Sequence, residues 1–260
     1  MPGDFPGSPG SDPSIMGGAL RDAAWILRRE WARVIGFSIL VVTPLEAGIA
    51  WLQQHAPGKP YSPLAIAFSI LVPWLLQGVA VALCVGGLAW SIDRRLHGER
   101  TSLADLILHA FRRWPTMVCV ELVASGALLG GLVLLVVPGL VAISRWLVAP
   151  QVAAIEGGGV RDALARSGYL TKGRRWLALG VFALELIAYY SGYYAISLPL
   201  QAIIGPAFLE PVPIALNRYL FSPLYGALMM GLSVVFYTVF FLRLVAARGS
   251  RGEITAEVFD

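Results

Sequence analysis

Long apolar runs alternate with short polar segments along this sequence, and the alternation is its strongest structural signal. Most of the apolar runs reach the roughly 20 residues that an α-helix needs to cross the hydrocarbon core of a bilayer. The pattern therefore predicts an all-α, polytopic membrane protein with six transmembrane helices. We place these spans at residues 34–53, 63–90, 116–137, 140–155, 176–198 and 223–246.

The longest apolar run, residues 116–156, contains two of these spans. A single helix of this length would measure about 60 Å, twice the thickness of the hydrocarbon core. Pro138-Gly139 is the turn signal near the middle of the run, so we expect a helical hairpin that turns at these two residues. The second helix of the hairpin is short, which leaves open whether the tip crosses the membrane completely.

Amphipathic helices are predicted in three polar segments, each just before a span that runs outward. They occupy residues 15–33, residues 102–114 and part of 157–176, and each combines an apolar face with arginines. We expect all three to lie on the cytoplasmic surface of the membrane. For the first helix, the alternative is a continuous extension of the first span into the cytoplasm. The apolar faces carry Leu27 and Trp31, then Phe111 and Trp114, then Leu164.

Basic residues are divided very unequally between the two sets of loops. With the amino terminus inside, the inner segments hold 17 of the 20 Lys and Arg residues, and the outer loops hold only Lys59 and Arg218. The remaining one, Arg145, lies inside the fourth span. Because loops rich in Lys and Arg stay in the cytoplasm, both termini are predicted to be cytoplasmic.

The composition agrees with a membrane location. The 260 residues are 57% hydrophobic and 14% charged, whereas a soluble domain is nearer half apolar and one quarter charged. This excess of apolar residues excludes an ordinary water-soluble domain. We predict a disordered tail at residues 1–14, a membrane domain at 15–246 and a cytoplasmic C-terminal tail at 247–260.

A basic corner that contains a tryptophan precedes each outward span. The corners read Arg28-Arg29-Glu30-Trp31, Arg112-Arg113-Trp114 and Arg174-Arg175-Trp176. Each leads into an outward and a returning span, which suggests three hairpin-like repeats. Because Arg and Trp are common at any inner membrane interface, chance similarity is the alternative.

Four ionisable residues fall inside the predicted spans: Glu46, Glu121, Arg145 and Glu185. Charged groups at membrane depth usually pair within the helix bundle or mark a pathway. Counting residues from the inner ends of the spans puts Arg145 and Glu185 at similar depth. We therefore expect these two to pair, with Glu46 as the second choice for Arg145. An interhelical polar network is the leading interpretation, and an ion or substrate relay is the alternative.

Catalytic and metal-binding motifs are not recognisable in the chain. Its two cysteines and three histidines lack the spacing of metal ligands, and we find no phosphate loop or nucleophile motif. We therefore expect no enzyme, no metal site and no cofactor. The basic residues adjoin apolar spans, which favours membrane lipids over nucleic acid as partners. The sequence leaves protein partners and homo-oligomers open.

Residues 138–176 carry a recognisable pattern. It consists of Pro138, Gly139, Arg145, Pro150, Glu156, Leu164, Ser167, Gly173 and Trp176. This stretch resembles the membrane domain of glycerophosphoryl diester phosphodiesterase-type proteins and is similar to related multi-spanning bacterial inner-membrane proteins. The resemblance implies a bacterial inner-membrane location. It does not extend to phosphodiesterase activity, which needs clustered carboxylates and histidines that no segment here supplies.

Together these patterns favour a non-enzymatic, multi-pass inner-membrane protein that acts through lipid or protein contacts in envelope maintenance. A small transporter, or a translocator of ions or lipids that uses the buried charges, is the alternative.

Overall fold

The computed structural model describes residues 15–55, 62–134, 136–204 and 216–248, and within these ranges the chain is helical without any strand. The predicted all-α class is therefore confirmed for the part described. The predicted tails lie outside these ranges, except for Ala247 and Arg248. The elements are α1 (Ile15–Gln54), α2 (Pro63–Leu96), α3 (Leu103–Leu134), α4 (Val136–Trp146), α5 (Ala149–Ile155), α6 (Val160–Thr171), α7 (Arg175–Ile204), a π-helical segment η2 (Asn217–Phe221) and α9 (Ser222–Ala246).

Six helical segments in the described chain are long and apolar enough to span a membrane. They are Ile15–Gln54, Pro63–Leu96, Leu103–Gly131, Val136–Ile155, Arg175–Pro199 and Asn217–Ala246. Each contains one of the six predicted spans or most of it, so the sequence pattern located these helices correctly. The expected boundaries were less accurate, because the fifth span was expected to end at residue 198 and α7 continues through Pro199.

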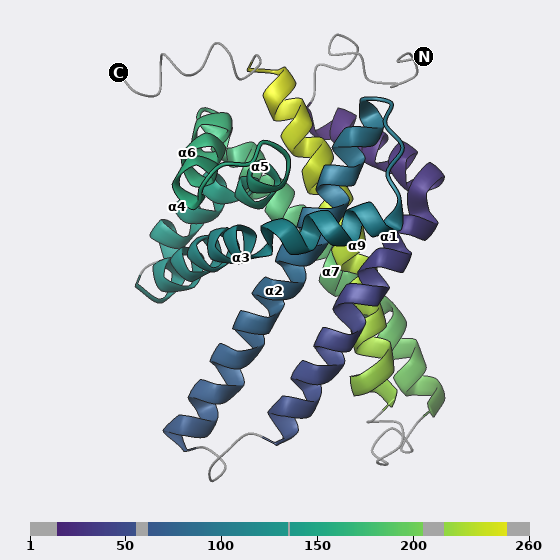
Figure 1. Cartoon of the computed structure of the whole chain (residues 1–260). Helices are drawn as coiled ribbons and strands as arrows, with labels where there is room; N and C mark the ends of the chain where they lie inside the picture. Colours follow the sequence, from purple (N-terminus) through teal and green to yellow (C-terminus); the bar gives the residue numbers. More distant parts are fainter. Residues whose placement is uncertain (1–14, 56–61, 135, 205–215, 249–260) are drawn as a thin grey trace.

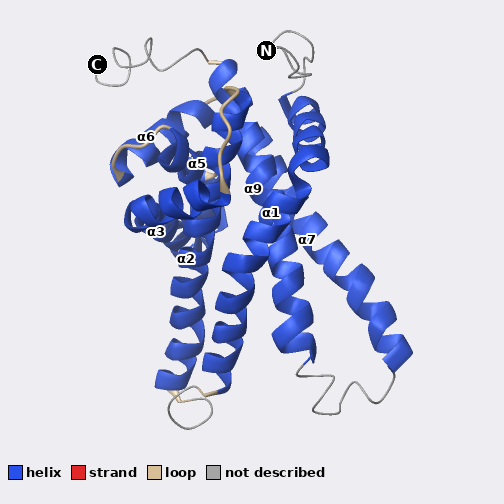
Figure 2. Ribbon diagram, turned by 45° about the vertical axis from the view of Figure 1, so that its right-hand side comes forward, coloured by secondary structure: helices blue, strands red, loops and turns tan. Residues whose placement is uncertain are grey.

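The long helices share one direction, and α3 does not. Figures 1 and 2 show α1, α2, α7 and α9 running lengthwise and reaching the lower end of the molecule. Helix α3 lies across them, and the α3–α4 hairpin ends well above the lower ends of α1 and α2. We call the upper end in Figure 1, where α1 begins and α2 and α9 finish, the polar end.

The first two predicted surface helices are not separate elements. Helix α1 is continuous over 40 residues, and α3 is continuous over 32 residues with Pro115 inside it. For α1 the structure therefore has the alternative arrangement, in which the amphipathic segment extends the first span. A helix of 40 residues is about 60 Å long, so α1 exceeds the hydrocarbon core by roughly half its length.

The hairpin turns a few residues earlier than the sequence suggested. Helix α3 ends at Leu134 and α4 begins at Val136, which puts Pro138 and Gly139 in the first turn of α4. Proline is tolerated there because the first amides of a helix have no intrahelical acceptor. A Cβ on Gly131 would lie 2.6 Å from the Gly139 nitrogen, so the two helices touch through glycine backbone at the turn.

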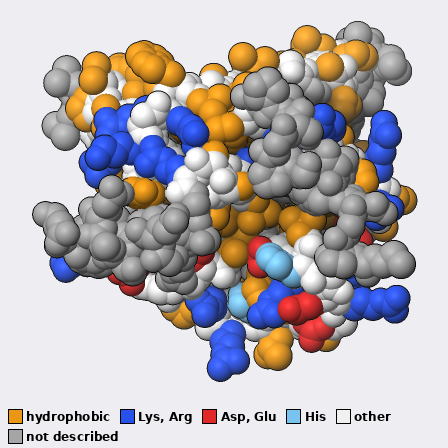
Figure 3. Space-filling view, turned by 90° about the horizontal axis from the view of Figure 1, so that it is seen from above, with side chains coloured by type: hydrophobic (Ala, Val, Ile, Leu, Met, Phe, Trp, Pro, Cys, Tyr) orange, Lys and Arg blue, Asp and Glu red, His pale blue; other side chains and the backbone are white. Residues whose placement is uncertain are grey.

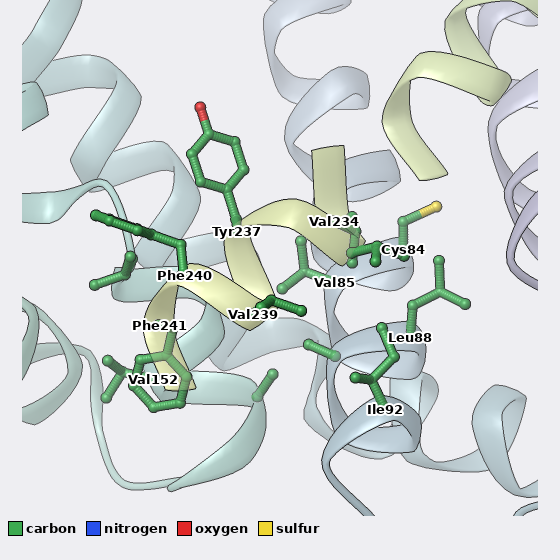
Figure 4. Close-up of a cluster of buried hydrophobic side chains, with 14 of the residues drawn as sticks. Cys84, Val85, Leu88, Ile92, Val152, Val234, Tyr237, Val239, Phe240 and Phe241 are labelled. Atoms are coloured by element: carbon green, nitrogen blue, oxygen red, sulfur yellow. The ribbon is translucent and has the colours of Figure 1, made fainter. Parts of the chain in front are cut away.

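Helix α9 forms the centre of the core. Its buried Val234 and Val239 face side chains of α2, and its buried Phe241 lies beside Val152 of α5 (Figure 4). Its other side packs closely on α1, where a Cβ on Gly231 of α9 would lie only 2.7 Å from a hydroxyl oxygen of that helix. Close packing of this kind accounts for much of the stability of interhelical contacts in a membrane.

A buried ion pair joins the two ends of the membrane domain. Nη2 and Nε of Arg243 in α9 donate to Oδ2 of Asp22 in α1 at 2.6 and 2.8 Å. The Asp22 side chain is fully buried, and that of Arg243 is 15% exposed. A Cβ on Gly18 would lie 1.8 Å from the Arg243 guanidinium, so a glycine at this position leaves room for the pair.

We predict that this ion pair is required for stability. Arg243→Met should lower the free energy of unfolding by about 3–5 kcal/mol, because the Asp22 carboxylate would stay buried without a partner. The double change Asp22→Leu with Arg243→Met should lose less than Arg243→Met alone. Unfolding in detergent would be measured for both variants.

The matched control is Arg94→Met. Arg94 forms an exposed pair with Glu99 at 2.8 Å, and an exposed pair contributes only about 0–1 kcal/mol. A loss for Arg243→Met no larger than that of the control would show that the buried pair does not hold α1 to α9.

Candidate functional site

Two of the four predicted charges come together inside the helix bundle. Glu121 of α3 lies close enough to Glu185 of α7 for their charges to interact. The Tyr237 hydroxyl of α9 donates a hydrogen bond to Oε2 of Glu185. We call Glu121 and Glu185 the carboxylate pair. Tyr237 was not identified from the sequence, because a tyrosine in an apolar span does not by itself indicate a polar partner.

Arg145 lies elsewhere, and the expected pairing is not present. Among the described residues it forms no ion pair with Glu185 or Glu46, and its side chain is exposed. Its guanidinium lies 6.0 Å from the centre of the Trp146 ring, and its Nε is 3.7 Å from where a Cβ would stand on Gly168 of α6. The depth estimate failed because it assumed one straight helix over residues 140–155. The chain instead leaves α4 after Trp146 and turns into α5 beside α6.

Glu46 belongs to a separate polar contact. It is half-buried on α1, where it interacts with the side chain of Gln77 on α2. The phenol of Tyr189 on α7 also lies near its charge. The expected single network of four residues is therefore divided into the carboxylate pair, a Glu46–Gln77 contact and an exposed arginine.

Residues 138–176, which carry the family-like pattern, fold into a compact unit formed by α4, α5, α6 and the start of α7. The side-chain hydroxyl groups of Ser167 and Thr171 donate to the carbonyl oxygen of Arg145 at 2.8 and 3.3 Å. Nε and Nη2 of Arg166 donate to the Glu156 carboxylate at 3.1–3.2 Å. These bonds tie α6 to the ends of α4 and α5, so the motif residues involved have structural roles.

The other motif residues shape the turns around this unit. Pro150 is buried in the first turn of α5, and Leu164 is partly buried on α6. Gly173 has a φ of +79°, a left-handed conformation that favours glycine, at the bend from α6 into α7. Trp176 is 87% exposed at the start of α7, as an aromatic anchor at a membrane surface would be.

The polar end carries most of the basic groups. Figure 3, which views this end from above, shows Lys and Arg side chains spread over it with a few acidic ones between them. The tryptophans of the three basic corners, Trp31, Trp114 and Trp176, are all exposed. Exposed Trp next to Arg is typical of the boundary between membrane and water.

Comparison with known proteins gives no further assignment. No family model matches the chain, and neither a curated protein nor a solved structure matches it. The resemblance to the phosphodiesterase-associated membrane domain therefore stays a prediction from residues 138–176. Within the described ranges, no group of three or more His, Cys, Asp or Glu residues converges as metal ligands would.

Proposed function

We propose that the chain is a non-enzymatic, multi-pass protein of a bacterial inner membrane that acts through lipid contacts at the cytoplasmic surface, in envelope maintenance. The transverse position of α3 is the observation that supports this proposal most. If α1, α2, α7 and α9 stand across the bilayer, then α3 lies along its plane (Figure 2).

The side chains of α3 suit a position within the membrane surface. Leu108 is 69% exposed, Phe111 60% and Trp114 42%, and Arg112 and Arg113 adjoin them. Apolar side chains next to arginines are what a helix presents when it lies between acyl chains and headgroups. If α3 faced water instead, the same side chains would form an exposed apolar patch that is energetically unfavourable.

This arrangement implies four crossings and one in-plane hairpin instead of six crossings. Both chain ends still lie on one side, because the Asp22–Arg243 pair holds the start of α1 to the end of α9. The strong bias of Lys and Arg toward that side supports a cytoplasmic location for it.

A second function is favoured by the carboxylate pair. The charges of Glu121 and Glu185 are within electrostatic range of each other, Glu185 accepts a hydrogen bond from the Tyr237 hydroxyl, and no described Lys or Arg forms an ion pair with either carboxylate. Two carboxylates inside a membrane bundle without a basic partner are typical of a site that takes up a proton or a cation. A translocator of protons or monovalent cations is therefore the second candidate.

We predict that a fluorophore on α3 reports contact with lipid headgroups. With Cys119 replaced by Ala, the variant Phe111→Cys would carry an environment-sensitive dye in reconstituted vesicles. A nitroxide near the lipid headgroup should quench this dye more strongly than one near the acyl-chain end, because α3 lies at the surface. The same dye on Ile70→Cys of α2 should be quenched more strongly by the nitroxide near the acyl-chain end.

Arg161→Cys on α6 serves as the control that is exposed to water. If aqueous iodide quenched the dye at position 111 as strongly as at position 161, the proposed surface contact of α3 would be refuted.

A proton-flux assay decides between the two functions. We predict that vesicles holding the wild-type protein dissipate an imposed pH gradient no faster than empty vesicles. A flux that Glu121→Gln and Glu185→Gln abolish, and that Glu46→Gln retains, would replace the lipid-contact function by the translocator. Glu46→Gln is the matched control because Glu46 is half-buried on α1 but lies outside the carboxylate pair.

A further inference from the structure

A cavity at the polar end lies between the first half of α1 and the end of α2. Its volume is about 250 Å³. The loop from α2 to α3 closes one side, where Gly98 has a φ of +84° and lets the chain turn back. The lining residues are Trp25, Ile26, Arg29, Glu30, Ile92, Arg95, Leu96, Gly98, Glu99 and Arg100.

One part of the cavity wall is apolar. Ile26 and Ile92 are almost completely buried beneath it, and Trp25 and Leu96 are partly buried beside them. A ligand that fills this cavity therefore needs an apolar portion as well as a charged one.

The acidic groups of the cavity already have arginine partners. Glu30 accepts a hydrogen bond from Nη1 of Arg95, with Nη1 of Arg33 at 3.9 Å from its other oxygen. Glu99 accepts two hydrogen bonds from Nη1 of Arg94 at 2.8 and 2.9 Å. Their negative charges are thus largely neutralised before any ligand arrives.

Two arginines of the lining have no acidic partner within the described chain. The Arg29 guanidinium lies over the Trp25 ring at 4.5 Å from its centre, and Arg100 follows Glu99 on the closing loop. Both side chains belong to exposed residues. They leave the cavity with an uncompensated positive charge at its mouth.

A set of buried and partly buried hydrogen bonds holds the frame of this cavity in place. Thr101 is buried, and its Oγ1 lies 2.9 Å from Ser91 Oγ. Nη1 of Arg33 donates to the same oxygen at 3.3 Å, and Nη2 of Arg95 donates to the Thr101 carbonyl at 3.4 Å. The loop is therefore fixed to α1 and α2, and the cavity does not depend on a ligand to form.

We propose that this cavity binds the phosphate-bearing headgroup of an anionic phospholipid from the inner leaflet. Arg29 and Arg100 meet the phosphate, and the Ile26, Ile92 and Leu96 wall receives the adjoining glycerol and first acyl methylenes. Guanidinium groups match the geometry of phosphate oxygens through paired hydrogen bonds. The inference rests on the proposed lipid-contact function and names the site and ligand class for it.

The size of the cavity and its apolar wall favour a lipid, rather than free phosphate, as the source of the bound phosphate group. A cavity of about 250 Å³ is near the lower limit for ligand sites, which suits a headgroup whose chains extend outside. Inorganic phosphate would leave the apolar wall uncovered. The site also lies at the end of α2, where that helix leaves the predicted span.

The test compares short-chain lipids as thermal stabilisers of the detergent-solubilised full chain. The probes are dioctanoyl phosphatidylglycerol, dioctanoyl phosphatidylcholine, glycerol 3-phosphate and inorganic phosphate. A ligand that binds only the folded protein raises its melting temperature with concentration. We expect phosphatidylglycerol to stabilise the wild type well below the concentrations at which the other three act.

The double variant Arg29→Gln with Arg100→Gln removes the two arginines without acidic partners. Its apparent affinity for phosphatidylglycerol should fall about tenfold or more, since each arginine at a lipid surface contributes about fivefold. The matched control is Arg28→Gln with Arg161→Gln, which removes two exposed arginines outside the cavity and should retain nearly the wild-type affinity. The lipid-free melting temperature of each variant reports whether it is folded, and Arg100→Gln alone provides a milder second variant.

Equal weakening in both double variants would mean diffuse attraction to the basic surface and would overturn the cavity site. Equal stabilisation by phosphatidylcholine, or by inorganic phosphate, would overturn the anionic lipid as its ligand. Neither result changes the dye-quenching outcome at position 111, so a failure of this site is distinguishable from a failure of the proposed function.

Discussion

The buried pair between Asp22 and Arg243 is the interaction on which the rest of the structure depends. It fixes the start of the longest helix, α1, to the end of the central helix, α9. A fully buried carboxylate without such a partner is strongly destabilising, so α1 and α9 have one favourable register. Helix α2 packs on this two-helix column, and α3 then packs on α2 across the column (Figure 1).

The chain separates its polar groups in two ways. At the polar end, arginines compensate acidic groups in pairs that range from exposed to buried, and a surplus of positive charge remains. Inside the bundle, Glu185 accepts a hydrogen bond from the Tyr237 hydroxyl, and no Lys or Arg of the described chain forms an ion pair with Glu121 or Glu185. Only the first arrangement suits an anionic lipid surface, which is why we propose lipid contact at the polar end and treat ion translocation by the carboxylate pair as the second candidate.

The sequence predicted the helical class and the location of the six apolar helices because length and hydropathy are local properties. It did not predict where helices continue past a boundary. The pattern predicts a break at Pro115, between the surface helix and the span that begins at residue 116, yet α3 passes through it, since packing against α2 outweighs the cost of one proline. The direction of α3 depends on that packing and therefore could not be predicted from a local sequence pattern.

The candidate site was likewise predicted only in part. Glu121 and Glu185 were identified as unusual because charges in apolar runs are visible in a sequence. The pairing of Arg145 was wrong in the structure because residue counting converts to depth only along an unbroken helix, and the chain breaks after Trp146. Asp22 was not predicted, although it is an acid among arginines whose buried neighbours on α1, Gly18, Ala19, Ala23 and Ile26, are apolar.

The position of the hairpin tip tests this account most directly. Val137 of α4 is 68% exposed, and Leu64 at the far end of α2 is 62% exposed, so either can carry the accessible cysteine in a chain in which Cys119 is replaced and Cys84 stays buried. An impermeant thiol reagent would be added to the outside of intact cells. We expect rapid modification at position 64 and none at position 137, because the tip of an in-plane hairpin does not reach the outer surface. Modification of both positions at equal rates would place the tip outside and contradict the in-plane hairpin.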